Sequence, residues 1–188
     1  MLRSLGHISS RDSKEPSLNF TIYDASVPLF VSSLTNMQAW LDKAAKERNE
    51  AELLEARLAP DMRPLPAQFQ LASDTAKGAV ARLAGVDNPS MADTEASFEE
   101  LKGRCRRTIE FIQSVGREEF EASAEREVIL KFGGNRAYRF IGRDYLTTFA
   151  LPNFFFHVTT AYAILRSKGV TLGKPDFLRQ LGSPNHQL

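Results

Sequence analysis

Apolar side chains recur along most of the chain at alternating spacings of three and four residues, the pattern of an amphipathic helix that buries one face. The pattern predicts three long helices before residue 115, with a shorter helical piece around residues 52–58. Their apolar positions are Tyr23, Val27, Phe30, Leu34, Met37, Leu41 and Ala44 in the first, Met62, Leu65, Phe69, Ala72, Ala76, Val80 and Leu83 in the second, and Phe98, Leu101, Cys105, Ile109 and Ile112 in the third.

Residues that favour helix ends set the limits of these segments. We expect Ser26 to cap the first helix, because Pro28 then falls in the first turn, where its missing N–H breaks no hydrogen bond. The other expected terminal residues are Asp61 as the cap of the second helix, Gly85 as its end, and Asp93 or Thr94 as the cap of the third.

Between Glu127 and Gly142 the period changes from helical to two. Apolar positions alternate with charged ones on either side of Gly133-Gly134-Asn135, which predicts a β-hairpin with glycines in its turn. The Gly-Gly pair is not expected to bind phosphate, because neither a Gly-Lys-Ser/Thr sequence nor a helix start follows it.

A last long helix is predicted from about Arg143 to Ser167, with Gly169 after its end. Asn153 and His157 interrupt an otherwise apolar face, and Pro152 is expected to kink the helix and to leave the carbonyl of Thr148 without its helical partner. The tail, residues 170–188, is expected to lie across the other helices through Leu172, Phe177 and Leu178.

Four long helices and one hairpin favour an all-α fold, a four-helix bundle with a small β-hairpin inserted before the last helix. We expect one domain over residues 19–188. Residues 1–18 are Ser-rich with mixed charge, and they are interpreted as a flexible, dispensable leader. Asp12 and Glu15 make a mitochondrial presequence the less favoured interpretation, and a cytoplasmic location is expected.

Composition narrows the classes of function. Lys plus Arg number 24 against 23 Asp plus Glu, a net charge of +1, so no nucleic-acid partner is expected. The longest apolar run, Ala161 to Leu165, is far shorter than the roughly 18 residues of a membrane-spanning helix. Cys105 is the single cysteine, lies on an apolar face, and is interpreted as a buried thiol and not as a nucleophile.

Two charged features receive structural interpretations. The run Lys102-Gly103-Arg104-Cys105-Arg106-Arg107 is expected to form a solvated helix face, with the rim of an anionic-ligand site as the rarer alternative. Asp74 and Lys77 are expected to form an ordinary i, i+3 pair.

Several separate motifs carry a family resemblance. They are Tyr-Asp-Ala-Ser-Val-Pro at 23–28, Ala-Arg-Leu-Ala-Pro-Asp-Met at 56–62, Ala-Lys-Gly-Ala at 76–79, Ala-Leu-Pro-Asn-Phe-Phe-Phe-His-Val-Thr-Thr-Ala-Tyr at 150–162 and Gly-Val-Thr-Leu-Gly-Lys-Pro-Asp-Phe-Leu at 169–178. In these motifs the chain resembles family nineteen ninety-three of the domains of unknown function. That family is similar to the DinB/YfiT-like superfamily of four-helix bundles, some of whose members are metal-dependent thiol transferases or isomerases.

The resemblance implies where a metal would bind in the superfamily: three histidines, one near the start of the second helix and two at i, i+4 on the last. Here Asn153 and His157 have the i, i+4 spacing, and Asp61 and Met62 stand at the start of the second helix. One histidine of three is matched, and a neutral amide is a weak ligand. A divalent metal cofactor is therefore disfavoured, and the cofactor is left unknown at this stage.

Two functions remain open at this stage, and the sequence does not establish whether the protein is an enzyme. The first is a small-molecule pocket between the second and last helices, lined by Asp61, Gln68, Asn153, His157 and Tyr162. There His157 is the candidate general base, with Asp61 or Asp74 near enough to raise its pKa or orient it. The alternative is a non-catalytic interaction module, such as a homodimer, in which Asn153 and His157 satisfy groups freed by Pro152.

Overall fold

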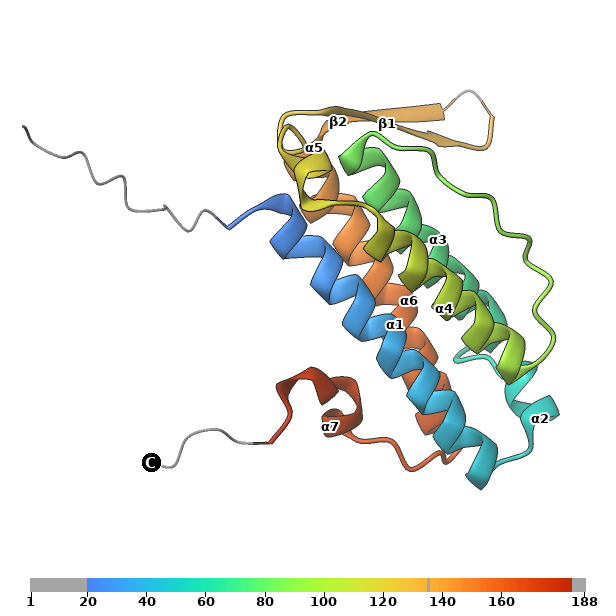
Figure 1. Cartoon of the computed structure of the whole chain (residues 1–188). Helices are drawn as coiled ribbons and strands as arrows, with labels where there is room; N and C mark the ends of the chain where they lie inside the picture. The colour runs from blue at the N-terminus through green and yellow to red at the C-terminus, as the bar shows by residue number, and fades with distance from the viewer. Residues whose placement is uncertain (1–19, 135, 184–188) are drawn as a thin grey trace, which may run out of the picture.

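Four long helices lie side by side as a bundle in the computed structural model, which describes residues 20–134 and 136–183 (Figure 1). They are α1 (Ile22–Glu47), α3 (Leu65–Ala84), α4 (Phe98–Ser114) and α6 (Leu151–Ser167). Around the bundle they follow the cyclic order α1, α4, α3, α6, and α1 also contacts α3 across it. The predicted all-α bundle is confirmed, whereas the predicted leader, residues 1–18, lies outside the described residues.

The first helix begins earlier than expected. Thr21 accepts a hydrogen bond from the backbone N–H of Asp24, whose carboxylate accepts one from the backbone N–H of Thr21 in return. This reciprocal cap replaces the expected cap at Ser26, so Pro28 lies in the second turn. Ser26 is instead buried, and its hydroxyl donates to the carbonyl of Ile22 at 2.6 Å.

The expected caps of the next two long helices were also wrong. After the short helix α2 (Glu50–Leu54), α3 begins at Leu65, because Asp61 belongs to an exposed turn before Pro64. Ser97 caps α4 by accepting a hydrogen bond from the backbone N–H of Glu100 at 3.2 Å. The expected end of α3 is confirmed: Gly85 has a left-handed φ of 76°.

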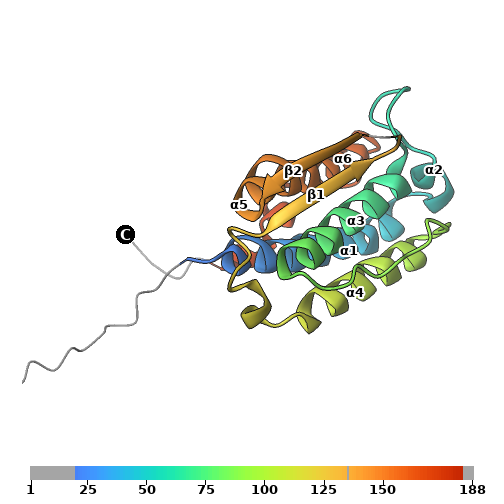
Figure 2. The same cartoon turned by 90° about the horizontal axis from the view of Figure 1, so that it is seen from above.

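The hairpin is confirmed between the short 3-10 helix η1 (Arg117–Phe120) and the last helical segment. Its strands, β1 (Glu127–Phe132) and β2 (Arg136–Ile141), are antiparallel and pair from Glu127 with Ile141 to Phe132 with Arg136. It lies over α3 and α6 (Figure 2). Gly142, where the chain leaves the hairpin, is packed so closely that an added Cβ would lie 1.8 Å from the carbonyl oxygen of Ser123.

The last helical segment is continuous but not uniform. It consists of α5 (Gly142–Tyr145), a π-helical turn η2 (Leu146–Ala150) and α6. In the π turn the N–H of Leu151 donates to the carbonyl of Leu146, five residues back. The break expected at Pro152 therefore takes the form of a wider turn placed directly before the proline.

The described part of the tail crosses the bundle as predicted. It contains α7 (Lys174–Phe177) and the 3-10 turn η3 (Arg179–Leu181). Phe177 stacks on Trp40 with ring centroids 5.6 Å apart, and the indole N–H of Trp40 donates to the carbonyl of Asp176 at 3.0 Å. Leu172 is buried and Leu178 is half-buried.

Within the described ranges, no helix is long and apolar enough to cross a membrane.

Candidate functional site

A chain of hydrogen bonds links the imidazole of His157 on α6 to the start of α3. Nδ1 of His157 lies 2.9 Å from Oε1 of Gln68, and Nε2 of Gln68 donates to the carbonyl of Arg63 at 2.9 Å. Because an amide nitrogen donates and an amide oxygen only accepts, Gln68 must accept at His157, so the Nδ1 atom carries the proton. The lone pair of the neutral ring is then on Nε2.

The environment of His157 favours that neutral form. The side chain is only 9% exposed, and burial lowers its pKa. Neither expected carboxylate reaches the ring: Asp61 is in the exposed turn, and Asp74 pairs with Lys77 at 3.1 Å and Arg104 at 2.8 Å. The expected i, i+3 pair of Asp74 with Lys77 is thus present, but the role suggested for Asp74 beside His157 is not.

The Nε2 atom of His157 is not fully buried. In the described part of the chain, Nε of Arg104 is the only fully buried side-chain nitrogen or oxygen without a hydrogen bond. No hydrogen bond to Nε2 of His157 occurs there either. Nε2 is therefore an acceptor that solvent or a ligand can reach.

Asn153 forms a second polar bridge between the same two helices. Its Nδ2 donates to Oγ1 of Thr75 at 2.7 Å, and that hydroxyl donates its own hydrogen to the carbonyl of Leu71 at 2.7 Å. The direction of both bonds is therefore fixed, and Oδ1 of Asn153 is left as a second acceptor without a hydrogen bond to any residue that the structure describes. Four residues apart on a helix, Asn153 and His157 have Cβ atoms about 6 Å apart.

These contacts contradict one part of the interaction-module hypothesis. Asn153 and His157 were expected in that case to satisfy backbone groups freed by Pro152. Both side chains instead reach across to α3, where they meet Thr75 and Gln68.

The structure places the five predicted pocket residues in three different surroundings. Gln68 and His157 are in contact, with Asn153 one turn away on α6. Tyr162 packs against Trp40 and Phe177, with centroid distances of 5.5 and 5.6 Å, and so belongs to the contact of α6 with α1 and α7. Asp61 lines a cavity of about 530 Å³ before α3, whose wall also includes Arg63.

The donor set does not fit the three-histidine metal centre of the superfamily. Residues 20–134 and 136–183 contain no group of three or more His, Cys, Asp or Glu side chains that could hold a metal ion. Along the seam of α3 and α6 the available atoms are one imidazole nitrogen and one amide oxygen. We therefore assign no metal-dependent step to these residues.

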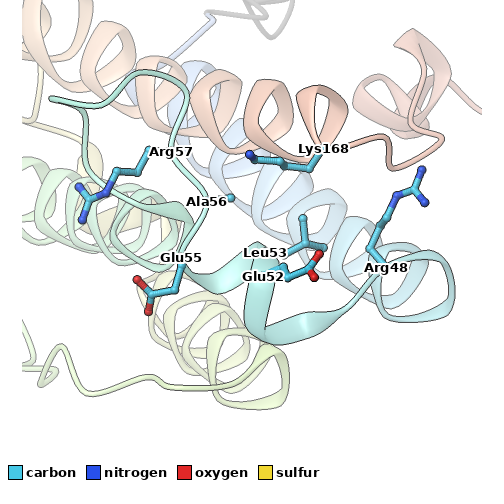
Figure 3. Close-up of a pocket in the computed structure, with 7 residues that line it drawn as sticks. All are labelled: Arg48, Glu52, Leu53, Glu55, Ala56, Arg57 and Lys168. Carbon is cyan, nitrogen blue, oxygen red and sulfur yellow. The ribbon is translucent and has the colours of Figure 1, made fainter.

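A cavity of about 480 Å³ near α2 is lined by many charged residues but lacks convergent geometry (Figure 3). Lys168 extends across the space toward Ala56, whereas the guanidinium groups of Arg48 and Arg57 point away from it. Both arginines bind backbone carbonyls, Arg48 that of Gly169 and Arg57 that of Met62, each at 2.6 Å. Their role is to hold the adjoining loops.

The run at 102–107 is only partly the solvated face that was expected. Arg104 is fully buried, and its guanidinium pairs with Asp74, Asp93 and Glu95 at 2.8 to 3.0 Å. The sequence contained a signal for this burial, because position 104 follows the buried Leu101 by three residues and precedes the buried Thr108 by four. Arg104 ties the connection between α3 and α4 to both helices. Cys105 is buried as expected, and burial raises the pKa of its thiol to about 12.

Comparisons with known proteins agree with this architecture. Residues 22–178 match the family model described as a domain of unknown function, DUF1993. The chain is also similar to the crystal structure of a DinB family member protein from Shewanella denitrificans, with a TM-score of 0.78 and 33% sequence identity. That similarity covers 89% of this chain and 95% of the other. No curated protein matches the chain.

Proposed function

The chain belongs to the DUF1993 family of unknown function, and we propose that it binds a small hydrogen-bond-donating molecule along the seam between α3 and α6. One observation carries the proposal: Nε2 of His157 and Oδ1 of Asn153 are two hydrogen-bond acceptors one helical turn apart. Hydrogen bonds to residues of α3 fix which atom of each side chain is the acceptor. Two acceptors without an accompanying donor favour ligand groups such as amides, ureas or amidines.

Binding is favoured over proton transfer by the residue that orients His157. A general base becomes charged during catalysis, and a carboxylate behind the ring stabilises that charge. Here the group behind the ring is the amide of Gln68, and burial lowers the pKa of His157. The arrangement thus stabilises a neutral acceptor.

A thermal-shift screen of small amides, ureas and amidines against the full chain tests the proposal, because a ligand of the folded state raises Tm by mass action. We expect hits whose effect disappears when their N–H groups are methylated. Asn153→Leu and His157→Gln should weaken the response, whereas Thr159→Ala, at an exposed site elsewhere on α6, should leave it unchanged. Hits that raise Tm equally well after methylation, or that still raise Tm in both variants, would refute the proposed site.

A second candidate function is self-association through the hairpin. Its support is a pair of aromatic side chains exposed on one face of the hairpin: Phe132 is 39% and Tyr138 58% exposed, and their ring centroids lie 5.5 Å apart. Clusters of this kind often mark protein contacts. Light scattering of the full chain and of the Phe132→Lys, Tyr138→Lys double variant would test it, since a dimer that uses this surface must dissociate in the variant.

A further inference from the structure

An apolar groove of about 500 Å³ lies beside the point where the described chain begins. One wall is the start of α1, with Phe20 and Ile22. The opposite wall contains Phe120 and Glu121 at the end of η1, and Leu146 with Thr147 from the π turn. Phe120 and Leu146 are buried core residues, so apolar side chains form the inner surface of this N-terminal groove.

Phe20 makes the groove unusual. It is 79% exposed, the most exposed of the large apolar side chains that the structure describes, and it borders a groove with an apolar inner surface. A single exposed apolar side chain needs no explanation, but one adjoining an open apolar concavity marks a surface suited to a partner.

We propose that the N-terminal groove is the docking site of the chain's own N-terminal segment, residues 1–19, with Leu18 as its apolar anchor. These 19 residues enter the described structure at Phe20, which lines the groove. In an extended chain alternate side chains lie on the same side, so an extended continuation from Phe20 presents Leu18 to the same concavity.

Covalent attachment favours this occupant over a free partner. A short tether holds a segment at an effective concentration in the millimolar range, so a small apolar contact is sufficient for docking. A second copy of the chain would have to compete with that local concentration.

The charges of the segment and of the groove are complementary. Residues 1–19 contain Arg3, Arg11 and Lys14 against Asp12 and Glu15. Acidic residues gather at the groove edge: Glu121 lines it, and Glu118 and Glu119 lie three and two residues before Glu121 in the chain. None of these three glutamates forms a salt bridge with a described residue. The groove thus gives a physical reason to revise the sequence-based expectation that residues 1–18 are dispensable.

Photo-crosslinking of the full chain tests the proposal directly. A benzophenone amino acid replaces Leu18 in one sample and Leu5 in a matched control, and trypsin with mass spectrometry locates the links. Apart from its α1 wall, which lies on the same tryptic peptide as position 18, the groove lies on two tryptic peptides, residues 118–126 and 144–166. A mixture of ¹⁴N and ¹⁵N chains separates links within one chain from links between copies.

We expect links from position 18 to fall on these two peptides of the same chain, several-fold more often than links from position 5. Leu18→Asp should also lower Tm by about 2 to 4 °C, a shift typical of the loss of one modest contact in a domain of this size. Leu5→Asp should leave Tm unchanged. Links that join different copies, or equal link distributions from both positions together with an unchanged Tm in Leu18→Asp, would overturn the assignment.

Discussion

Gln68 accepts a hydrogen bond from Nδ1 of His157 at 2.9 Å, while its own amide nitrogen is committed to the carbonyl of Arg63. The tautomer of His157 is therefore set by α3. We predict that ¹⁵N NMR will show a neutral ring protonated at Nδ1, with a pKa below the usual value of about 6.5. Gln68→Glu places a carboxylate against the ring and should raise that pKa, whereas Gln38→Glu on α1 should not. An unchanged pKa in Gln68→Glu would show that the two side chains are not in contact in solution.

Burial of His157 should make stability depend on pH near neutrality. Because burial lowers its folded-state pKa, the unfolded chain binds a proton below pH about 6.5 that the folded chain does not. The free energy of unfolding should therefore fall as pH drops from about 6.5 toward the folded-state pKa, and it should be independent of this group above that range. Urea denaturation of the wild type and of His157→Gln between pH 5 and 8 measures the difference. Parallel profiles for the two proteins would contradict the prediction.

The stability of two variants at position 157 should differ at neutral pH. His157→Ala leaves Oε1 of the buried Gln68 without its donor and should cost about 1 to 3 kcal/mol. His157→Gln retains an N–H that can reach Gln68, and most of the stability should remain. Chemical denaturation measures the free energy of unfolding of both variants. An equal loss in the two would mean that the packing of the imidazole ring, and not its hydrogen bond to Gln68, is what stabilises the fold.

Arg104 should be the most sensitive position in its basic run. Arg104→Ala leaves the side chain of Glu95, which is 4% exposed, without its main counter-charge. Removal of one partner of a buried ion pair costs about 3 to 5 kcal/mol. Arg106→Ala, which breaks an exposed pair with Glu99, should cost at most about 1 kcal/mol. Thermal unfolding compares the two variants directly. Similar losses of stability in both would mean that the Arg104 side chain is exposed to solvent and not buried.

Gly142 should not tolerate a side chain, although its φ is not positive. An added Cβ would lie 1.8 Å from the carbonyl oxygen of Ser123, and a backbone atom cannot move aside cheaply. Gly142→Ala should therefore cost about 1 to 3 kcal/mol or more. Gly133→Ala in the hairpin loop, where no atom lies within 4 Å of an added Cβ, is the matched control. Urea unfolding of the two variants should separate them clearly.

The bundle could be predicted from the sequence because burial of apolar faces fixes helix positions over many residues at once. The end of a helix, in contrast, depends on which one of several nearby residues caps it. In α1 the reciprocal cap of Thr21 with Asp24 forms in place of the expected cap at Ser26. Spacing also placed Asn153 and His157 on one side of α6.

Spacing could not identify the partners of these two residues, because contact with Gln68 and Thr75 depends on how α3 and α6 align along their axes. For the same reason Tyr162 was grouped with His157, although the tail brings Phe177 against it from a different direction.

The π turn before Pro152 has a consequence for how this helix can change. A turn closed by a five-residue bond contains one residue more than the α-helix would need, so it acts as a stored insertion. Tyr145 and Phe149, before or within the extra turn, contact rings of the hairpin, and Asn153 and His157, beyond it, contact α3. Because the wider turn already takes up the extra residue, deleting a single residue between 146 and 150 would leave a regular α-helix whose two halves keep their orientations toward the hairpin and toward α3. A single-residue deletion is thus tolerable inside this turn, whereas the same deletion within α6 would rotate Asn153 or His157 away from α3 by about 100°.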